Sequence, residues 1–244
     1  TVIYALVFDY VFKDNRKIKN QKKSKDKYYK NKYCFTNEIN FDYRGDTMNS
    51  FKQIADCYMD FLKSESKCKD GSFINFKKFI ELNHTVGNFI PVPFKSFGDR
   101  KYVSFNQIRN SKVGDYWDLT LNYIHKWYIS KKDEDLMNLV GNSDDYLNIA
   151  KEWLKGFGNG NEGWKNFVDK NYLKGSFVND RYEPQEFWLN HFSGKIKPED
   201  IYQCEEFFSN VSKWIEIRGQ KISEMIKIKL EKNLDNNQVI KEIS

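Results

Sequence analysis

The stretch Pro198-Glu-Asp-Ile-Tyr-Gln-Cys-Glu-Glu-Phe-Phe-Ser-Asn-Val-Ser-Lys-Trp-Ile-Glu-Ile-Arg-Gly-Gln-Lys-Ile222 predicts a long helix that continues to about Leu230. Its proline suits the first position of a helix, where no backbone N–H is required. Gly219 lies within this range and predicts either a kink or the close approach of a neighbouring segment. Apolar residues recur on one stripe at helical spacing, which favours packing against a core: they are Ile201, Cys204, Phe208, Val211, Ile215, Ile222 and Met225.

Further helices are predicted on the N-terminal side of this stretch. The clearest covers residues 49–65, where apolar residues keep the i, i+3, i+4, i+7 rhythm behind a polar capping region. Ser143 and Pro184 have the positions of helix start signals. The tail from Lys232 is polar and is expected to fray. The remaining predicted ranges are 73–82, 115–129, 144–158, 162–173 and 184–192.

A small β-sheet is predicted beside the helices. Residues 1–12 alternate and are rich in strand-forming residues, and the prolines at 91 and 93 favour extended backbone over residues 86–94. Residues 100–105 are expected to pair with that segment. The predicted fold class is therefore mainly α (α+β), a helical domain with a small sheet formed by the N-terminal and 86–105 segments. No internal repeat or Pro/Gly linker interrupts the chain, so residues 1–244 are interpreted as a single α-rich domain.

Positive charge is concentrated in one segment. Residues 13–32 contain ten basic and two acidic residues, a balance of +8, whereas the whole chain carries +6, so the rest sums to −2. The segment has no apolar period and is interpreted as a mobile loop or a hairpin tip. Cationic side chains bind phosphates, and the tyrosines at 28, 29 and 33 have rings that can stack on bases. The lysines predicted to bind nucleic acid are Lys17, Lys19, Lys22, Lys23, Lys25 and Lys27.

Composition and missing motifs exclude several classes. No apolar run approaches the roughly 20 residues that span a bilayer, and residues 1–12 lack the basic n-region of a signal peptide. The four cysteines have no CxxC spacing and only three histidines accompany them, so no metal site is predicted and a reducing cytoplasm is expected. Walker A, HExxH and GxSxG motifs are missing, and the cofactor stays unknown.

The first candidate site is His84-Thr-Val-Gly-Asn-Phe-Ile-Pro-Val-Pro93. In a functional interpretation, His84 acts as acid/base or phosphate ligand, Thr85 and Asn88 bind the ligand, and Gly87 lets the backbone approach it. The alternative is a helix end whose threonine and asparagine satisfy turn backbone before a buried strand. The alternative is favoured over the functional interpretation.

The second candidate site combines Asn106-x-x-Arg109 with Asp115-x-x-Asp118. On a helix the two aspartates share a face, and paired carboxylates hold a divalent metal or divide acid and base roles. The favoured alternative makes Asp115 an N-cap and places Asp118 in the first turn, supporting the helix dipole or pairing with Arg109. Arg218 is expected either to reach a carboxylate such as Asp118 or to lie on the surface.

These motifs resemble an uncharacterised bacterial family classed as a domain of unknown function. The resemblance rests on 41–47, 85–93, Asn106-x-x-Arg109 and 115–121, and it extends to 217–222. It groups Arg44, among the ligand-binding candidates, with the polar residues above, and it places the first forty residues outside the family. Asn110 departs from the glycine that the family tends to have after the arginine. The family has no established activity, so the resemblance implies no reaction.

Two principal functions are weighed, and whether the chain is an enzyme stays open. The first is a cytoplasmic protein that interacts with RNA, DNA or a nucleotide, of the toxin or phage-defence type. The second is a protein-interaction module or inhibitor whose polar cluster is structural and whose six tryptophans supply core and contact surface. A weaker third hypothesis is a metal-dependent hydrolase that uses Asp115 and Asp118.

Overall fold

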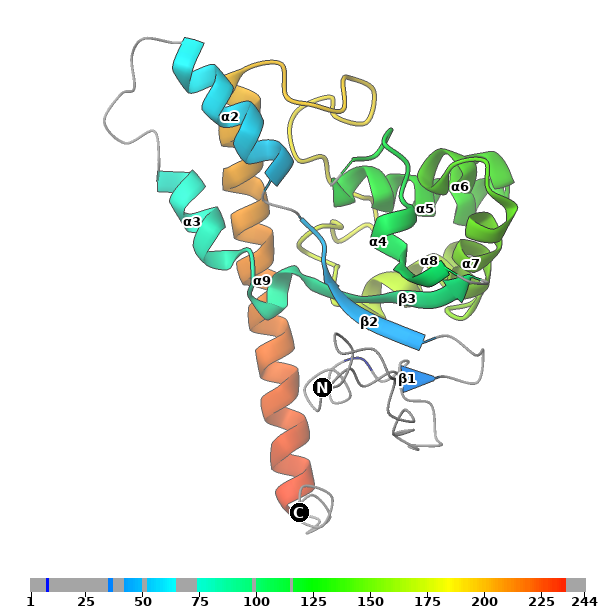
Figure 1. The fold of residues 1–244 in the computed structure, drawn as a ribbon. Helices are drawn as coiled ribbons and strands as arrows, with labels where there is room; N and C mark the ends of the chain where they lie inside the picture. Colours follow the sequence, from blue (N-terminus) through cyan, green and yellow to red (C-terminus); the bar gives the residue numbers. More distant parts are fainter. Residues whose placement is uncertain are drawn as a thin grey trace.

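The protein is mainly helical, with a small antiparallel sheet (Figure 1). The computed structural model describes residues 8, 35–36, 42–49, 52–64, 74–97, 100–114 and 116–235. The strands are β1 (Phe35–Thr36), β2 (Asp42–Thr47), β3 (Phe89–Phe97) and β4 (Arg100–Ser104). The helices are α2 (Lys52–Ser64), α3 (Ile74–Leu82), the 3-10 turn η2 (Val86–Asn88), α4 (Phe105–Ile108), α5 (Trp117–Ser130), α6 (Asp133–Val140), α7 (Asp144–Lys155), α8 (Gly160–Lys170) and α9 (Ile201–Asp235).

The sheet has the order β1-β2-β3-β4, and each strand is antiparallel to its neighbour. The predicted pairing of 100–105 with the proline-containing strand is confirmed, since Phe94 lies opposite Ser104. The strand on the other side of β3 is β2, whose Thr47 lies opposite Phe89. The expected strand at residues 1–12 lies outside the described residues, apart from Phe8, which is buried.

Helix α9 is the central element of the fold. Figure 1 shows α2 and α3 packed along its N-terminal half, while α4 to α8 gather on the other side. The apolar stripe predicted from the sequence faces these neighbours: the Phe208 ring lies 5.1 Å from that of Tyr58 and 5.6 Å from that of Phe79. On the opposite flank, the Trp214 ring contacts Phe187 and Phe177 at 5.8 and 5.6 Å. Both flanks of the core are therefore built on one helix.

Gly219 admits a neighbour, as one of the two sequence alternatives predicted. The neighbour is η2, whose Gly87 lies so close to α9 that an added Cβ would be 2.0 Å from the carbonyl oxygen of Ile215. A Cβ on Gly219 would meet Gly87 only at an ordinary 3.6 Å. Gly87 therefore lets the turn approach a helix backbone. The ligand approach expected for this residue stays a prediction.

The helix expected at 184–192 is wrong. Side chains take the place of helical hydrogen bonds there, because Glu186 accepts from the backbone N–H groups of Asn190 (3.1 Å) and Phe192 (2.7 Å). Asn190 itself has a left-handed φ of 65°.

Conversely, α6 was not predicted, although its first turn carries Asp133, Glu134 and Asp135, which suit a helix N-terminus.

Several helix ends differ from the sequence expectation by a few residues. Helix α7 ends at Lys155 and α8 begins at Gly160, so the expected boundary at Gly158 is a turn with a left-handed φ of 114°. Helix α9 extends to Asp235, beyond the point at which the tail was expected to fray, and residues 236–244 lie outside the described part. Short-range signals thus located the helices more accurately than their ends.

Candidate functional site

Asn88 joins the turn before β3 to the end of β2. Its amide oxygen accepts from the backbone N–H and the side-chain amide of Asn49, each at 3.0 Å. Its amide nitrogen donates to the carbonyl oxygens of Asn49 (3.1 Å) and Asn83 (2.8 Å). All three asparagines are buried. This side chain therefore satisfies backbone groups that would otherwise be buried without partners.

The neighbours of Asn88 in the first candidate motif lie at the helix end. Thr85 donates its hydroxyl to the carbonyl of Leu82 at 2.7 Å, which completes the end of α3. His84 lies in the same turn and is exposed. The turn-backbone alternative thus describes the contacts of Thr85 and Asn88, while His84 is the most exposed residue of this motif.

Arg218 is fully buried in the middle of α9. Its Nη1 donates to the carbonyl oxygens of Gly87 and Phe89, both at 2.7 Å, and to that of Val86 at 3.3 Å. Its Nε donates at 2.9 Å to the carbonyl of Asn171, the C-cap of α8, where the helix dipole is negative. The inward orientation agrees with one sequence alternative, but the expected Asp118 partner is wrong.

Asn106, from the second candidate site, belongs to a group of contacts between β2 and α4. The Asp46 carboxylate accepts from the Ser104 hydroxyl at 3.1 Å, and the Asn106 amide donates to the carbonyl of Thr47 at 2.9 Å. Ser104 also begins α4 through a capping box with Gln107. Asp46, Thr47 and Asn106 are half-buried. These contacts fix the short helix against the end of the sheet.

Arg109 continues this group toward α5. Its Nη1 donates to the Thr120 hydroxyl at 2.8 Å, and its guanidinium lies 5.4 Å from the Trp117 ring centroid. Arg44 lies in β2 opposite Val92, and its side chain is outside the described part. Asp115 also lies outside the described residues, and the N-cap of α5 is Tyr116, which corrects the N-cap expectation.

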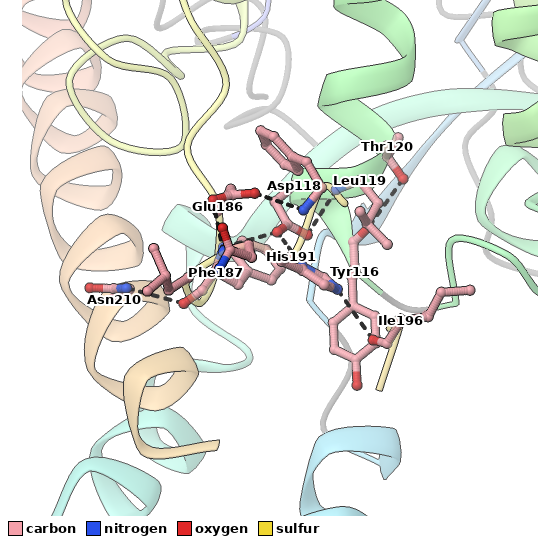
Figure 2. A network of polar contacts seen from close by, with 12 residues as sticks. Tyr116, Asp118, Leu119, Thr120, Glu186, Phe187, His191, Ile196 and Asn210 are labelled. Carbon is pink, nitrogen blue, oxygen red and sulfur yellow. Dashed lines mark hydrogen bonds and ion pairs between the residues drawn. The ribbon is translucent and has the colours of Figure 1, made fainter. Parts of the chain in front are cut away.

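Asp118 and His191 form a buried pair at the start of α5 (Figure 2). The carboxylate Oδ2 lies 2.5 Å from His191 Nδ1 and accepts from the backbone N–H of Phe187 at 2.9 Å. Oδ1 accepts from the N–H of Leu119 at 2.8 Å. Asp118 lies in the first turn, as expected, but it pairs with His191 and not with Arg109.

The electrostatics of this pair suit a structural role. Burial raises the pKa of Asp118, while hydrogen bonds from His191, Phe187 and Leu119 oppose that shift. The other ring nitrogen, Nε2, lies 3.2 Å from the carbonyl of Ile196. Both imidazole nitrogens face protein acceptors, and the side chains of Asp118 and His191 are fully buried. The pair therefore fastens the loop 184–200 to α5.

Asp118→Asn should lower the free energy of unfolding by about 3 kcal/mol, since removing one member of a buried pair strands the other. The neutral amide also places N–H groups where His191 and Phe187 donate. Urea unfolding followed by tryptophan fluorescence measures the loss. Asp133→Asn is the matched control, because it breaks a half-exposed 2.8 Å contact with Lys151 and should cost less than about 1 kcal/mol. Equal losses for both variants would contradict the structural role.

A glycine motif joins α7 to α8. Residues 158–163, Gly-Asn-Gly-Asn-Glu-Gly, have the GxGxxG spacing of dinucleotide-binding turns. That motif requires a preceding strand, whereas here it follows a helix. A Cβ on Gly163 would lie 2.5 Å from the Gly158 backbone and 2.7 Å from Tyr128. The glycines therefore permit close packing of the turn.

Apart from the exposed His84 and from Asp115 and the Arg44 side chain, which lie outside the described part, the candidates form three contact groups that are buried or half-buried. In the described part of the chain, no group of three or more His, Cys, Asp or Glu side chains is arranged to hold a metal ion. The six lysines assigned to nucleic acid, Lys17, Lys19, Lys22, Lys23, Lys25 and Lys27, lie outside the described residues. Over the ranges described, no helix is long and apolar enough to cross a membrane.

Comparison with known proteins gives one family match. A model described as a family of unknown function (DUF6994) matches residues 12–222. The family resemblance seen in the sequence is confirmed, but its expected start is wrong, because the match begins before the lysine-rich segment 13–32 and includes it. No curated protein and no solved structure matches the chain.

Proposed function

The chain belongs to the family of unknown function DUF6994, and we propose that it is a nucleic-acid-binding protein whose lysine-rich segment contacts the phosphates. The observation that carries this proposal is the charge distribution. Residues 13–32 hold a balance of +8, while the whole chain carries only +6. Such local charge attracts polyanions and gives binding that weakens with salt.

The contacts of the polar motif residues support a scaffold role for the folded body. Asn88, Arg218 and Asp118 are buried, and their polar groups are directed at backbone or at His191. Groups engaged in this way hold elements together and are not presented to a substrate. A binding function therefore fits the geometry better than a reaction at these residues.

Single-stranded RNA or DNA is the proposed ligand. Tyr28, Tyr29 and Tyr33 follow the lysines, and aromatic rings stack on unpaired bases without regard to sequence. A nucleotide offers the same chemistry with fewer phosphates, so it should bind more weakly and with a smaller dependence on salt.

The test replaces all six lysines at 17, 19, 22, 23, 25 and 27 with glutamine in the full chain. Fluorescence anisotropy with a labelled 20-nucleotide single-stranded RNA then gives the affinity over a range of salt concentrations. If about four phosphates are contacted, log K against log salt should have a slope of about −3 in the natural chain. The variant should bind at least about tenfold more weakly, with a slope nearer zero.

Two controls make the result specific. The same six positions changed to arginine keep the charge and should keep the affinity within about a factor of three. A thermal melt of each variant shows whether the fold is intact. Unchanged RNA and DNA binding by the glutamine variant would refute the proposal.

The proposal places this binding in the cytoplasm, in a toxin or phage-defence role. Four cysteines without CxxC spacing suit a reducing compartment. Growth of cells that express the natural chain or the glutamine variant tests the biological setting: growth inhibition by the natural chain alone is the expected result.

A protein-interaction module is the second candidate function, and exposed apolar side chains favour it. Leu189 and Tyr202 are 71% and 79% exposed. They lie near one another, because the Leu189 N–H donates to Glu206, one helical turn beyond Tyr202. Affinity purification of the natural chain beside a Leu189→Ser/Tyr202→Ser variant tests this candidate, with loss of the same partner as the supporting result.

A further inference from the structure

From the geometry around Tyr182 we infer a second phosphate-binding surface, on the folded body, that contacts the same single-stranded nucleic acid as segment 13–32. This inference rests on the proposed function and extends it to described residues. The surface, here called the Tyr182 surface, consists of Tyr182 with Lys165, Lys174 and Lys221.

Tyr182 is held rigidly at this surface. Its backbone has a left-handed φ of 66°, which is uncommon for an aromatic residue. Its carbonyl accepts from the indole N–H of Trp164 at 2.7 Å. Its hydroxyl donates to the carboxylate of Asp169, with distances of 3.0 and 3.1 Å to the two oxygens. Contacts at both ends of the residue thus fix the ring before any ligand arrives.

Two ammonium groups lie over this one ring. Lys174 Nζ is 4.2 Å and Lys165 Nζ 5.4 Å from the ring centroid of Tyr182. Within the described part of the chain, neither lysine has an ion-pair partner. A third cation, Lys221, donates from Nζ to the carbonyl of Lys174 at 2.5 Å. The ring therefore gathers cations that like-charge repulsion would otherwise separate.

The carboxylates close to this surface are those of Asp169, Glu183 and Asp180, the last of which lies with Lys221 Nζ beside Gly175. Among the described residues none of them forms an ion pair with Lys165, Lys174 or Lys221. Asp169 accepts from the Tyr182 hydroxyl, and Glu183 accepts from the Asn179 amide at 2.8 Å and lies 3.6 Å from Arg181 Nε. The lysine ammonium groups are therefore available for an external anion. Closely spaced cations beside a fixed aromatic ring match the phosphate backbone of a single strand.

Two neighbouring segments and one distant helix supply the cations. Lys165 belongs to α8, Lys174 to the following loop and Lys221 to α9. The surface thus exists only in the folded chain, whereas segment 13–32 carries its charge by composition alone. A strand that contacts both would gain affinity because the second contact is intramolecular.

The test compares two double variants of the full chain in the anisotropy assay with 20-nucleotide RNA. Lys165→Gln/Lys174→Gln should bind about five- to tenfold more weakly, and the salt slope should be shallower by about 1.4, the value for two lost contacts on a single strand. Lys112→Gln/Lys155→Gln removes the same charge from exposed positions elsewhere and should change the affinity by less than about twofold.

The outcomes separate this inference from the proposed function. Weakening by the segment 13–32 variant but not by Lys165→Gln/Lys174→Gln would overturn the Tyr182 surface and leave the proposed function standing. The reverse result would support the surface and refute the role of the segment. Equal weakening by both double variants would show a net-charge effect and overturn the surface. If the natural chain bound phosphatidylserine vesicles and no RNA, both ideas would fail.

Discussion

Arg218→Ala is expected to lower the free energy of unfolding by about 4 kcal/mol or more, a large share of the 5–15 kcal/mol typical of a domain. The guanidinium donates to four carbonyl oxygens, those of Val86, Gly87, Phe89 and Asn171. Hydrogen bonds to a charged group are each worth about 1.5–3 kcal/mol, and their loss leaves buried acceptors unsatisfied. One side chain thus connects α9 to the turn before β3 and to the end of α8.

Urea unfolding with tryptophan fluorescence and far-UV circular dichroism measures this effect. Arg218→Lys keeps the charge but not the fork of donors, so it should recover only part of the stability. Arg181→Ala is the matched control, because its side chain is 83% exposed and its loss should cost less than about 0.5 kcal/mol. A loss of less than about 1 kcal/mol in the free energy of unfolding of Arg218→Ala would contradict the proposal that Arg218 connects α9 to the turn and to α8.

Gly87→Ala is expected to have an effect of similar size. The new methyl carbon would lie 2.0 Å from the carbonyl oxygen of Ile215 and 2.9 Å from its carbon. Both are backbone atoms of α9, so no side-chain rotation relieves the overlap, and the helix and turn must separate. Overpacking of this kind costs about 1–3 kcal/mol or more, and here it also stretches the bonds of Arg218 to the same turn.

The partner glycine supplies the control from the other side of the contact. A Cβ on Gly219 would lie 3.6 Å from Gly87 Cα, an ordinary contact distance. Gly219→Ala should therefore be neutral or stabilise by up to about 1 kcal/mol, because alanine favours a helix interior more than glycine does. Thermal melts of Gly87→Ala and Gly219→Ala compare the stabilities of the two variants. Equal destabilisation by both would contradict the asymmetry of the contact.

Local sequence signals identified most of the helices and part of the sheet. The stripe of 201–225, the capping region before 52 and the prolines at 91 and 93 each act within a few residues, so their effect is visible in the chain. Residues 184–192 do not form the expected helix, because Glu186 and Asp118 accept hydrogen bonds from backbone N–H groups of that loop. Phe187, whose backbone N–H donates to Asp118, is 69 residues away from it, a separation that no local rule includes.

The candidate residues were recognisable as unusual, but their partners were not. The turn-backbone alternative agrees with the local bonds of Thr85 to Leu82 and of Asn88 to Asn83. The bonds of Asn88 to Asn49, 39 residues away, are not visible in the sequence. The sequence alone does not identify His191 as the partner of Asp118. The 2.5 Å contact between these two side chains joins elements 73 residues apart.

The sequence by itself determined the helical class, the proline-rich strand with its β4 neighbour, and the segregation of charge into residues 13–32. These follow from periodicity, backbone restriction and composition, which are properties of short stretches. Tertiary structure alone decided that Arg218 meets carbonyls rather than a carboxylate, that Lys165 and Lys174 lie over the Tyr182 ring, and that Lys221 donates to the Lys174 carbonyl. A buried charge takes whichever partners the packed helices bring within about 3 Å, and that choice is made only when distant segments meet.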